Sequence, residues 1–247
     1  MQIIISPAKR MVQDLDSFVP VSRPMYIEEA TTLLAAMKRL SRPAAQALWR
    51  CSDRVADAAY KTLQNSRLDG PLTPALMSFV GLQYQAMAPD LFTAPALDYV
   101  QTHLRILSGL YGVLRPFDGV VPYRLSLDEA LAVGGARNLY DFWGARLHAG
   151  LAFGPGTVLD LASVEYSRAV TPYLTPGQAL VPVVFGRVVG GRVRVQATHA
   201  KQARGAMVRF LAEHQVTALA DVAAFDDPRY RFDAARSDRA HLVFTER

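Results

Sequence analysis

One segment of the chain, residues 103–125 (HLRILSGLYGVLRPFDGVVPYRL), combines glycines and arginines in a way that suits anion binding. Gly109 and Gly112 flank a two-residue turn, and glycine permits positive φ and a close approach of a ligand to the backbone. Arginine presents a planar fork of donors to phosphate or carboxylate. The three arginines of the segment are Arg105, Arg115 and Arg124. The alternative interpretation is a helix end followed by a turn that Pro116 stops.

Polar residues also follow three predicted strands. They are Ser6 and Lys9 after residues 3–5, Ser163, Glu165 and Tyr166 after residues 157–161, and His199, Lys201 and Arg204 after residues 192–198. In open sheets that carry helices on their faces, ligands bind beyond the carboxyl ends of the strands. If the three strands are parallel, these groups converge on one crevice. The alternative is that each group lies on a separate, solvated surface turn.

Four of these residues are candidates for catalysis: Lys9, Glu165, Tyr166 and Lys201. A lysine at a strand end contacts an anion or, when it is desolvated, acts as a nucleophile. Glu165 close to Lys9 or Lys201 would form an acid–base pair. Most lysines in proteins do neither, so a solvated surface role is the alternative for each.

Several familiar site types are missing from the sequence. The five histidines have no HExxH or other metal-ligand spacing, and there is no glycine-rich phosphate loop. Cys51 is the only cysteine, which excludes an intramolecular disulfide and a thiolate metal cluster. We therefore predict no metal site and no cofactor.

The composition is that of a globular protein with a sizeable core. The chain has 247 residues, 51% of them hydrophobic and 20% charged, and a net charge of +5. A positive surface favours anionic partners such as nucleic acid or phosphorylated metabolites. No apolar run is long enough for a membrane span, and the N-terminus does not resemble a signal peptide. We expect a cytoplasmic protein with no membrane partner.

The patterning predicts helices in the first part and strands toward both ends. Helices are expected at residues 28–40, from Ser41-Arg42-Pro43 onward, at 52–63, 97–107, 139–151 and 200–213. Strands are expected at 3–5, at 157–161 after a Gly-Pro-Gly turn at 154–156, at 180–189 and 192–198 around Gly190-Gly191, and at 241–245. This pattern predicts a mixed α/β (α+β) fold in which helices flank a mixed sheet, formed by residues 1–247 as a single domain.

Several long motifs, in order along nearly the whole chain, resemble the YaaA family of bacterial peroxide stress resistance proteins. They are ISPAK at 5–9, LRILSGLYGVLRP at 104–116, PYRL at 122–125, LYDFWG at 139–144, LAS-x-EY at 161–166 and AKQARGAMVRF at 200–210. The resemblance implies a cytosolic protein that protects cells from hydrogen peroxide and limits free iron. It also implies a positively charged cleft, a helix-hairpin-helix element, and binding to duplex or branched DNA.

The turn between Gly109 and Gly112 is the predicted place of the helix-hairpin-helix element, with Arg115 beside it. Backbone N–H groups in such a turn hold phosphates without reading sequence.

The chain departs from the family pattern at three places. Leu82 stands at an acidic position, Ser126 and Leu127 replace a glutamate and a methionine, and Arg229 replaces a glycine.

Three functions remain open at this stage. The first is a stress protein that binds DNA with little sequence preference and limits iron-driven damage. The second is an enzyme that acts on a small anionic or nucleotide-like substrate, and the third, ranked lowest, is an iron-binding protein. The predicted anion-binding or nucleic-acid-binding residues are Ser6, Lys9, Arg105, Gly109, Gly112, Arg115, Arg124, Ser163, Lys201 and Arg204.

Overall fold

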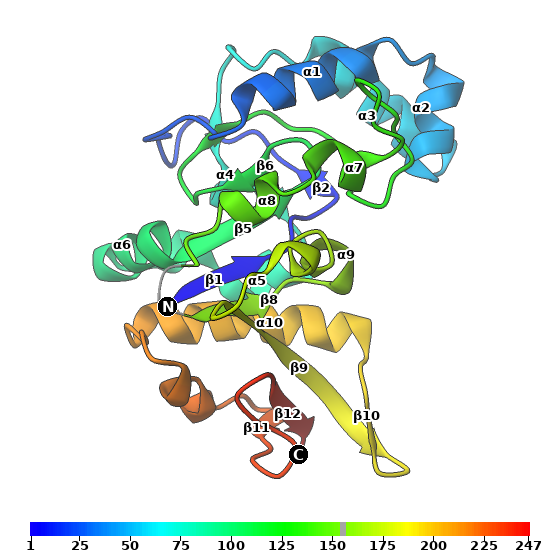
Figure 1. Cartoon of the computed structure of the whole chain (residues 1–247). Coiled ribbons are helices and arrows are strands. Elements are labelled where there is room, and N and C mark those ends of the chain that lie inside the picture. Colours follow the sequence, from blue (N-terminus) through cyan, green and yellow to red (C-terminus); the bar gives the residue numbers. More distant parts are fainter. Residues whose placement is uncertain (154–156) are drawn as a thin grey trace.

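Short runs of aliphatic and β-branched residues form the strands of one main sheet in the computed structural model, which describes residues 1–153 and 157–247 (Figure 1). The strand order is β11-β12-β9-β8-β1-β5-β6, and β10 pairs with β9 outside this path. Their bounds are β1 Gln2–Ile5, β5 Leu104–Ser108, β6 Gly112–Leu114, β8 Thr157–Leu161, β9 Ala179–Val189, β10 Arg192–Arg194, β11 Tyr230–Phe232 and β12 Leu242–Glu246. Two small pairs, β2 (Arg10–Met11) with β4 (Phe79–Val80) and β3 (Thr73–Pro74) with β7 (Gly119–Val120), lie apart from it.

The centre of the main sheet is parallel. β1 lies between β5 and β8, with Ile5 opposite both Ile106 and Leu161, and β8, β9 and β12 continue in the same direction. All four residues of β1 are buried, and its three isoleucines form the continuous apolar run that a parallel sheet favours. From β1 the chain passes first to β5 on one side and later to β8 on the other. The sheet therefore has a topological switch point at the carboxyl ends of β1 and β8.

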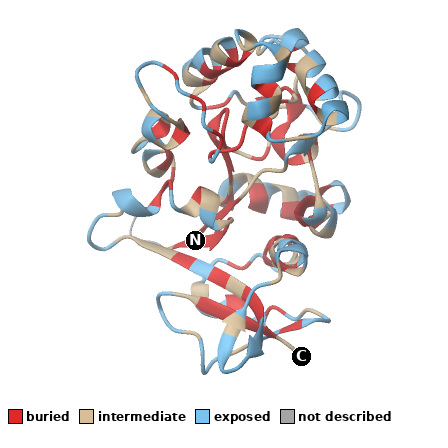
Figure 2. Cartoon of the chain, turned by 90° about the vertical axis from the view of Figure 1, so that its right-hand side faces the viewer, coloured by how far each residue is buried: buried red, intermediate tan, exposed pale blue. Residues whose placement is uncertain are grey.

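Helices cover the sheet and extend the molecule beyond its β6 edge (Figure 1). Their bounds are α1 Ile27–Lys38, α2 Arg42–Trp49, α3 Asp53–Asn65, α4 Ala75–Ser78, α5 Leu82–Met87, α6 Ala94–His103, α7 Leu139–Trp143, α8 Arg146–Ala149, α9 Val164–Ser167 and α10 Ala197–Glu213. Three 3₁₀ turns are η1 Pro89–Leu91, η2 Thr171–Tyr173 and η3 Leu219–Ala224. Figure 2 shows buried residues on the strands and on the inward helix faces, with exposed residues outside.

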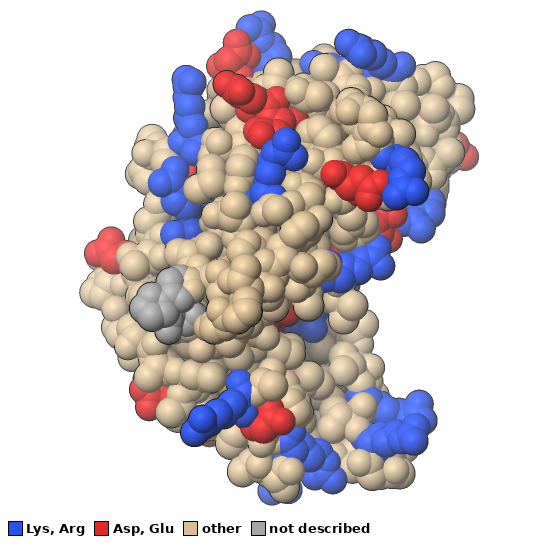
Figure 3. Space-filling view, in the orientation of Figure 1, with Lys and Arg blue, Asp and Glu red and all other residues tan. Residues whose placement is uncertain are grey.

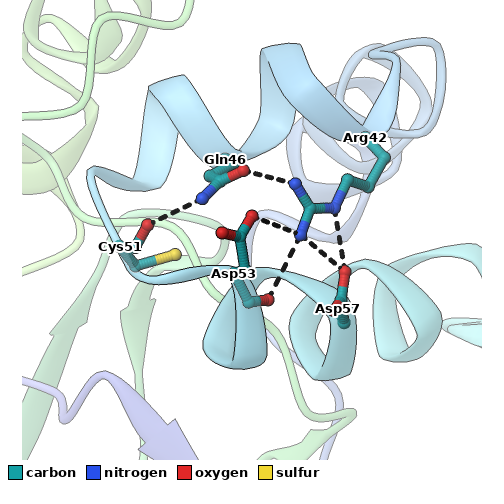
Figure 4. Close-up of polar contacts among 5 residues, drawn as sticks. All are labelled: Arg42, Gln46, Cys51, Asp53 and Asp57. Carbon is teal, nitrogen blue, oxygen red and sulfur yellow. Dashed lines mark hydrogen bonds and ion pairs between the residues drawn. The ribbon is translucent and has the colours of Figure 1, made fainter.

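Hydrogen bonds from Arg42 connect α2 to α3 (Figure 4). Its guanidinium group donates to Asp57 Oδ1 at 2.6 and 2.9 Å and to Asp53 Oδ1 at 2.9 Å, and it also contacts Gln46. Gln46 in turn donates to the carbonyl oxygen of Cys51 in the connection between the helices. The predicted start of a helix at Ser41-Arg42-Pro43 is confirmed: α2 begins at Arg42, and the Ser41 hydroxyl accepts the N–H of Ala44.

The glycine turn at residues 109–112 joins two strands and not two helices, so the predicted place of the helix-hairpin-helix element is wrong. The predicted helix over 97–107 ends at His103, and β5 and β6 form an antiparallel hairpin in which Ser108 pairs with Gly112. Helices joined by three-residue connections occur instead at α1–α2 and α2–α3. The apolar residues of the run Leu104-Arg-Ile-Leu suit either a helix or a buried strand. The run is a strand in the structure because it pairs with β1.

Other predicted elements are confirmed with shifted ends. The helix predicted over 139–151 is divided into α7 and α8 at Gly144, whose φ is +48°. β10 ends at Arg194, and the residues predicted to continue it begin α10 at Ala197. The remaining predicted helices and strands agree to within a few residues. The turn predicted at 154–156 lies outside the described residues.

Candidate functional site

A pocket of about 390 Å³ lies at the switch point of the sheet, beyond the ends of β1 and β8. The two strand ends are joined through their serines. Ser6 Oγ lies 3.2 Å from Ser163 Oγ and accepts the backbone N–H of Ser163 at 2.8 Å. Both serines line the pocket. The space-filling view in Figure 3 shows a hollow on the side of the molecule to which β1 points.

The start of α5 forms a second wall of the pocket. The Tyr84 hydroxyl and the Gln83 side-chain amide both donate to the carbonyl oxygen of Ser6, at 3.0 and 3.3 Å. α5 is held close by α10, because Gly205 leaves no side chain between them. A Cβ atom at Gly205 would lie 1.9 Å from the carbonyl oxygen of Gln83. The sequence motif around Gly205 therefore serves the pocket indirectly, through the distance between two helices.

Cationic side chains line this pocket. They are Lys9, Arg10, Arg124, Lys201 and Arg204. Burial lowers the pKa of Arg204, and the charge of Asp160 opposes this effect. The Nε atoms of Arg124 and Arg204 are buried and have no hydrogen-bond partner among the described residues. Unpaired buried donors are costly, so these two atoms favour a ligand that supplies acceptors.

Glu165 is the acidic side chain of the lining. Burial and then the negative charge of Asp128 raise the pKa of Glu165, and the positive charge of Lys9 acts in the opposite direction. Its Oε1 atom is buried and lacks a hydrogen-bond partner among the described residues. Tyr166 is buried beside it, and burial raises the pKa of that phenol well above its usual value. Lys9 is therefore close enough to Glu165 for its charge to act on that carboxyl group.

Glu129 is a buried carboxyl group close to this site, and it was not predicted from the sequence. It is 1% exposed, and its Oε2 atom accepts the backbone N–H of Ser126 at 3.0 Å. Burial raises the pKa of Glu129 to about 7, although that hydrogen bond and the charges of Lys9 and Arg124 lower it. The spacing Ser126-x-x-Glu129 matches a capping box, which is the signal that could have drawn attention to it.

The structure brings together most of the predicted site residues. Those that line the pocket are Ser6, Lys9, Arg124, Ser163, Glu165, Tyr166, Lys201 and Arg204. The reason for this convergence differs partly from the one predicted. Ser6 and Ser163 follow parallel strands, but among the described residues β10 pairs only with β9 and is antiparallel to it. Lys201 and Arg204 reach the pocket because α10 crosses beside α5.

Arg105 and Arg115 do not line this pocket. Arg115 forms an ion pair with the buried Asp118 at 3.2 Å, and Arg105 donates to the carbonyl oxygens of Leu104 and Gln101. Burial, followed by the charge of Arg115, lowers the pKa of Arg105. These contacts fix the chain around β5 and β6 and give both arginines a structural role.

Gly109 and Gly112 are buried against the core. A Cβ atom at Gly109 would lie 2.4 Å from the carbonyl oxygen of Leu125, and one at Gly112 would lie 2.7 Å from the Trp143 ring. Gly112 also has a φ of +73°, which disfavours other residues. Close packing therefore explains both glycines, and neither backbone is open to a phosphate.

Two of the departures from the family pattern, Leu82 and Ser126, line the pocket. Arg229 lies elsewhere, beside His199 and Glu246.

Among the described residues, no group of three or more His, Cys, Asp or Glu side chains is arranged to hold a metal ion. Within that same part of the chain, no helix combines the length and apolarity needed to cross a bilayer.

The fold and the pocket define a class: α/β proteins with a cation-lined pocket at the switch point of a mainly parallel sheet. Comparison with known proteins identifies the family of the chain. It belongs to the family described as peroxide stress protein YaaA, whose profile matches residues 1–236. The match supports a role in peroxide stress.

The similarity to individual relatives extends over the full length. A UPF0246 protein of Lactiplantibacillus plantarum is 50% identical over 244 residues, which are 99% of this chain and 98% of the relative. A UPF0246 protein of Lacticaseibacillus paracasei is also 50% identical, over 99% of both chains. A more distant one, from Agathobacter rectalis, is 40% identical over 99% of this chain and 98% of its own length.

Proposed function

We propose that the chain contributes to peroxide resistance by binding DNA on the face of the molecule around the pocket. We call this face, which carries the hollow seen in Figure 3, the hollowed face. The observation that carries the proposal is the gathering of Lys9, Arg124, Lys201 and Arg204 at one place. Hydroxyl radicals formed from peroxide and iron damage DNA, and a bound protein would shield the strand or assist its repair. The iron effect expected of the family would then be indirect.

The β9–β10 ribbon supports DNA as the partner. It projects on the side of the molecule where α9 and the start of α10 lie (Figure 1), and Figure 3 shows Lys and Arg side chains beside the hollow above it. Arg187 is directly opposite Arg194, and Arg192 is opposite Val189, so all three arginines share one face of the ribbon. We call this the arginine face.

The arginine face favours an anionic partner for a physical reason. Like charges directly opposite each other on two strands destabilise the pair, and an anion between them relieves the repulsion. The three arginines are exposed, and they take part in no ion pair with another described residue. A two-stranded ribbon also has the dimensions that fit the major groove of DNA.

The salt dependence of DNA binding tests this proposal. The logarithm of the affinity for a duplex should fall linearly with the logarithm of salt concentration, with a slope of about −0.9 per neutralised phosphate. Changing Arg192→Gln should reduce the magnitude of the slope by about one, and changing all three arginines by up to about three. Arg67→Gln is the matched control, because Arg67 is exposed and paired with Asp69. Affinity that is insensitive to salt would contradict phosphate binding.

A second candidate function is favoured by the shape of the pocket. A volume of about 390 Å³ lies near the lower end of the range of about 300–1,000 Å³ that small-molecule sites occupy. Glu165 retains its proton to a higher pH than an exposed glutamate and lies within the field of Lys9, as general acid–base catalysis requires. In this alternative the protein is an enzyme for a small anionic or nucleotide-like substrate. Turnover of such a substrate, lost in Glu165→Gln, would establish it.

A further inference from the structure

The pocket and the arginine face are too different in size to hold the same part of a DNA molecule. The ribbon fits a groove, and the major groove of a duplex is about 12 Å wide. The pocket holds about 390 Å³ and is bounded by the segments that follow β1 and β8, by residues 123–126 and by α5 and α10, so a duplex cannot enter it. Only a small unit of the polymer has the right size.

The lining suits one nucleotide. Cationic groups suited to a phosphate line the pocket, among them Lys9 and Lys201. Leu82, which is 37% exposed, contributes aliphatic surface on which a base packs, and the largely buried Tyr84 and Tyr123 form part of the wall behind it. The edge of a base carries both donors and acceptors. The unpartnered Nε atoms of Arg124 and Arg204 and the unpartnered Oε1 atom of Glu165 supply the complementary groups.

We propose that this pocket receives a single nucleotide that is extruded from a DNA strand lying on the hollowed face. This inference rests on the proposed function, because the strand must first be held there. Extrusion costs unpairing and unstacking, and the cost is smallest where a nucleotide is mismatched or already unpaired. The protein should therefore prefer DNA that contains such a nucleotide, whereas phosphate contacts alone give no such preference.

The test compares affinities for an intact duplex and for the same duplex with one bulged nucleotide, measured by fluorescence anisotropy at one salt concentration. We expect the bulged duplex to bind at least tenfold more tightly, which corresponds to about 1.4 kcal/mol. Leu82→Trp fills the pocket from its mouth, where Leu82 is 37% exposed, and should reduce the ratio of the two affinities to within twofold of one. Leu91→Trp, at an exposed leucine that does not line the pocket, should leave the ratio unchanged.

Gly81→Leu is a second filling variant if Leu82→Trp fails to fold. Gly81 lines the pocket in an extended conformation, with φ at 172°, and a Cβ atom there makes an ordinary contact of 3.4 Å with Ala8. A ratio that persists in a folded filling variant would overturn the proposal. So would salt-dependent duplex binding without any preference for the bulge, an outcome that leaves the proposed function intact.

Free nucleotides provide the remaining arm of the experiment. A nucleoside monophosphate lacks the neighbouring phosphates, so it should bind far more weakly than the bulged duplex. If the mononucleotide binds as tightly as the bulged duplex, the pocket serves free nucleotides and the extrusion proposal is wrong. If the protein binds no DNA at all, both this proposal and the proposed function are wrong.

Discussion

Glu165, which is half-buried, and Glu129, which is buried, influence the chain in different ways. Glu165 lines the pocket, whereas Glu129 is not part of the lining and accepts a hydrogen bond from the backbone of Ser126, which is. Burial is the main reason why the pKa of each is raised. Both are desolvated, yet only Glu165 is placed to contact a ligand. Substitutions at the two positions should therefore change different properties.

Glu129→Gln should alter the pH dependence of stability. The pKa of Glu129 is about 7 in the folded chain against 4.5 for an unperturbed glutamate, so the folded state binds more protons between these values. Stability contributed by this residue therefore falls as the pH rises from about 4.5 to 7, by on the order of 3 kcal/mol in total. The variant should remove this component and be more stable than wild type at pH 8. Urea denaturation at pH 5 and pH 8 measures the difference, and equal effects at both values would contradict it.

Glu165→Gln should separate binding from catalysis. The change removes a negative charge at nearly constant shape, so affinity for DNA should be unchanged or slightly higher. If Glu165 serves as an acid or base for Lys9, the same change abolishes activity while binding survives. Survival of cells in peroxide is the deciding measurement. Loss of protection with DNA binding intact would count against shielding and favour the enzyme.

At the scale of elements, the contact between α10 and α5 determines the shape of the pocket. α10 supplies Lys201 and Arg204, and α5 supplies the Tyr84 hydroxyl that holds the end of β1. Gly205 sets the distance between the two helices. The same glycine therefore controls both walls of the pocket although it does not line it.

Gly205→Ala should destabilise the protein. In an open helix, replacing glycine with alanine gains up to about 1 kcal/mol. Here the added Cβ atom would lie 1.9 Å from a backbone carbonyl oxygen, and the forced shift should cost about 1–3 kcal/mol. Gly81→Ala is the control, since its Cβ atom makes only a 3.4 Å contact. A melting temperature of Gly205→Ala at or above that of wild type would show that the helices separate without cost.

The hairpin at β5 and β6 shows where sequence reasoning fails at this scale. The arginines and glycines around Gly109 and Gly112 predicted a phosphate site. In the structure both glycines are buried against the core, so a phosphate cannot reach their backbone. Arg115 pairs with Asp118, and the turn packs against Trp143 and Leu125. Tertiary packing of this kind has no local signature, so neither the strand nor the burial of the turn could be derived from the segment alone.

At the scale of the whole molecule, the mixed sheet with flanking helices and the meeting of the strand-end residues were predictable. An apolar strand followed by Ser6 and another followed by Ser163 imply a shared edge if the strands are parallel, and they are neighbours in the sheet. The position of Lys201 in the pocket was not predictable, because it depends on the contact between α10 and α5. Glu129 was missed because its importance comes from burial and not from its neighbours in sequence.

The central position of β1 also has a consequence for how the chain folds. Ser6, directly after this strand, hydrogen-bonds to a serine 157 positions later, and Ile5 pairs with Leu161. During synthesis β1 therefore leaves the ribosome well before either of its partners, β5 and β8. Such long-range parallel pairing is slow, and until it occurs an apolar strand edge is exposed to other chains. The yield of this protein in cells should accordingly depend on chaperones that protect its N-terminal segment during translation.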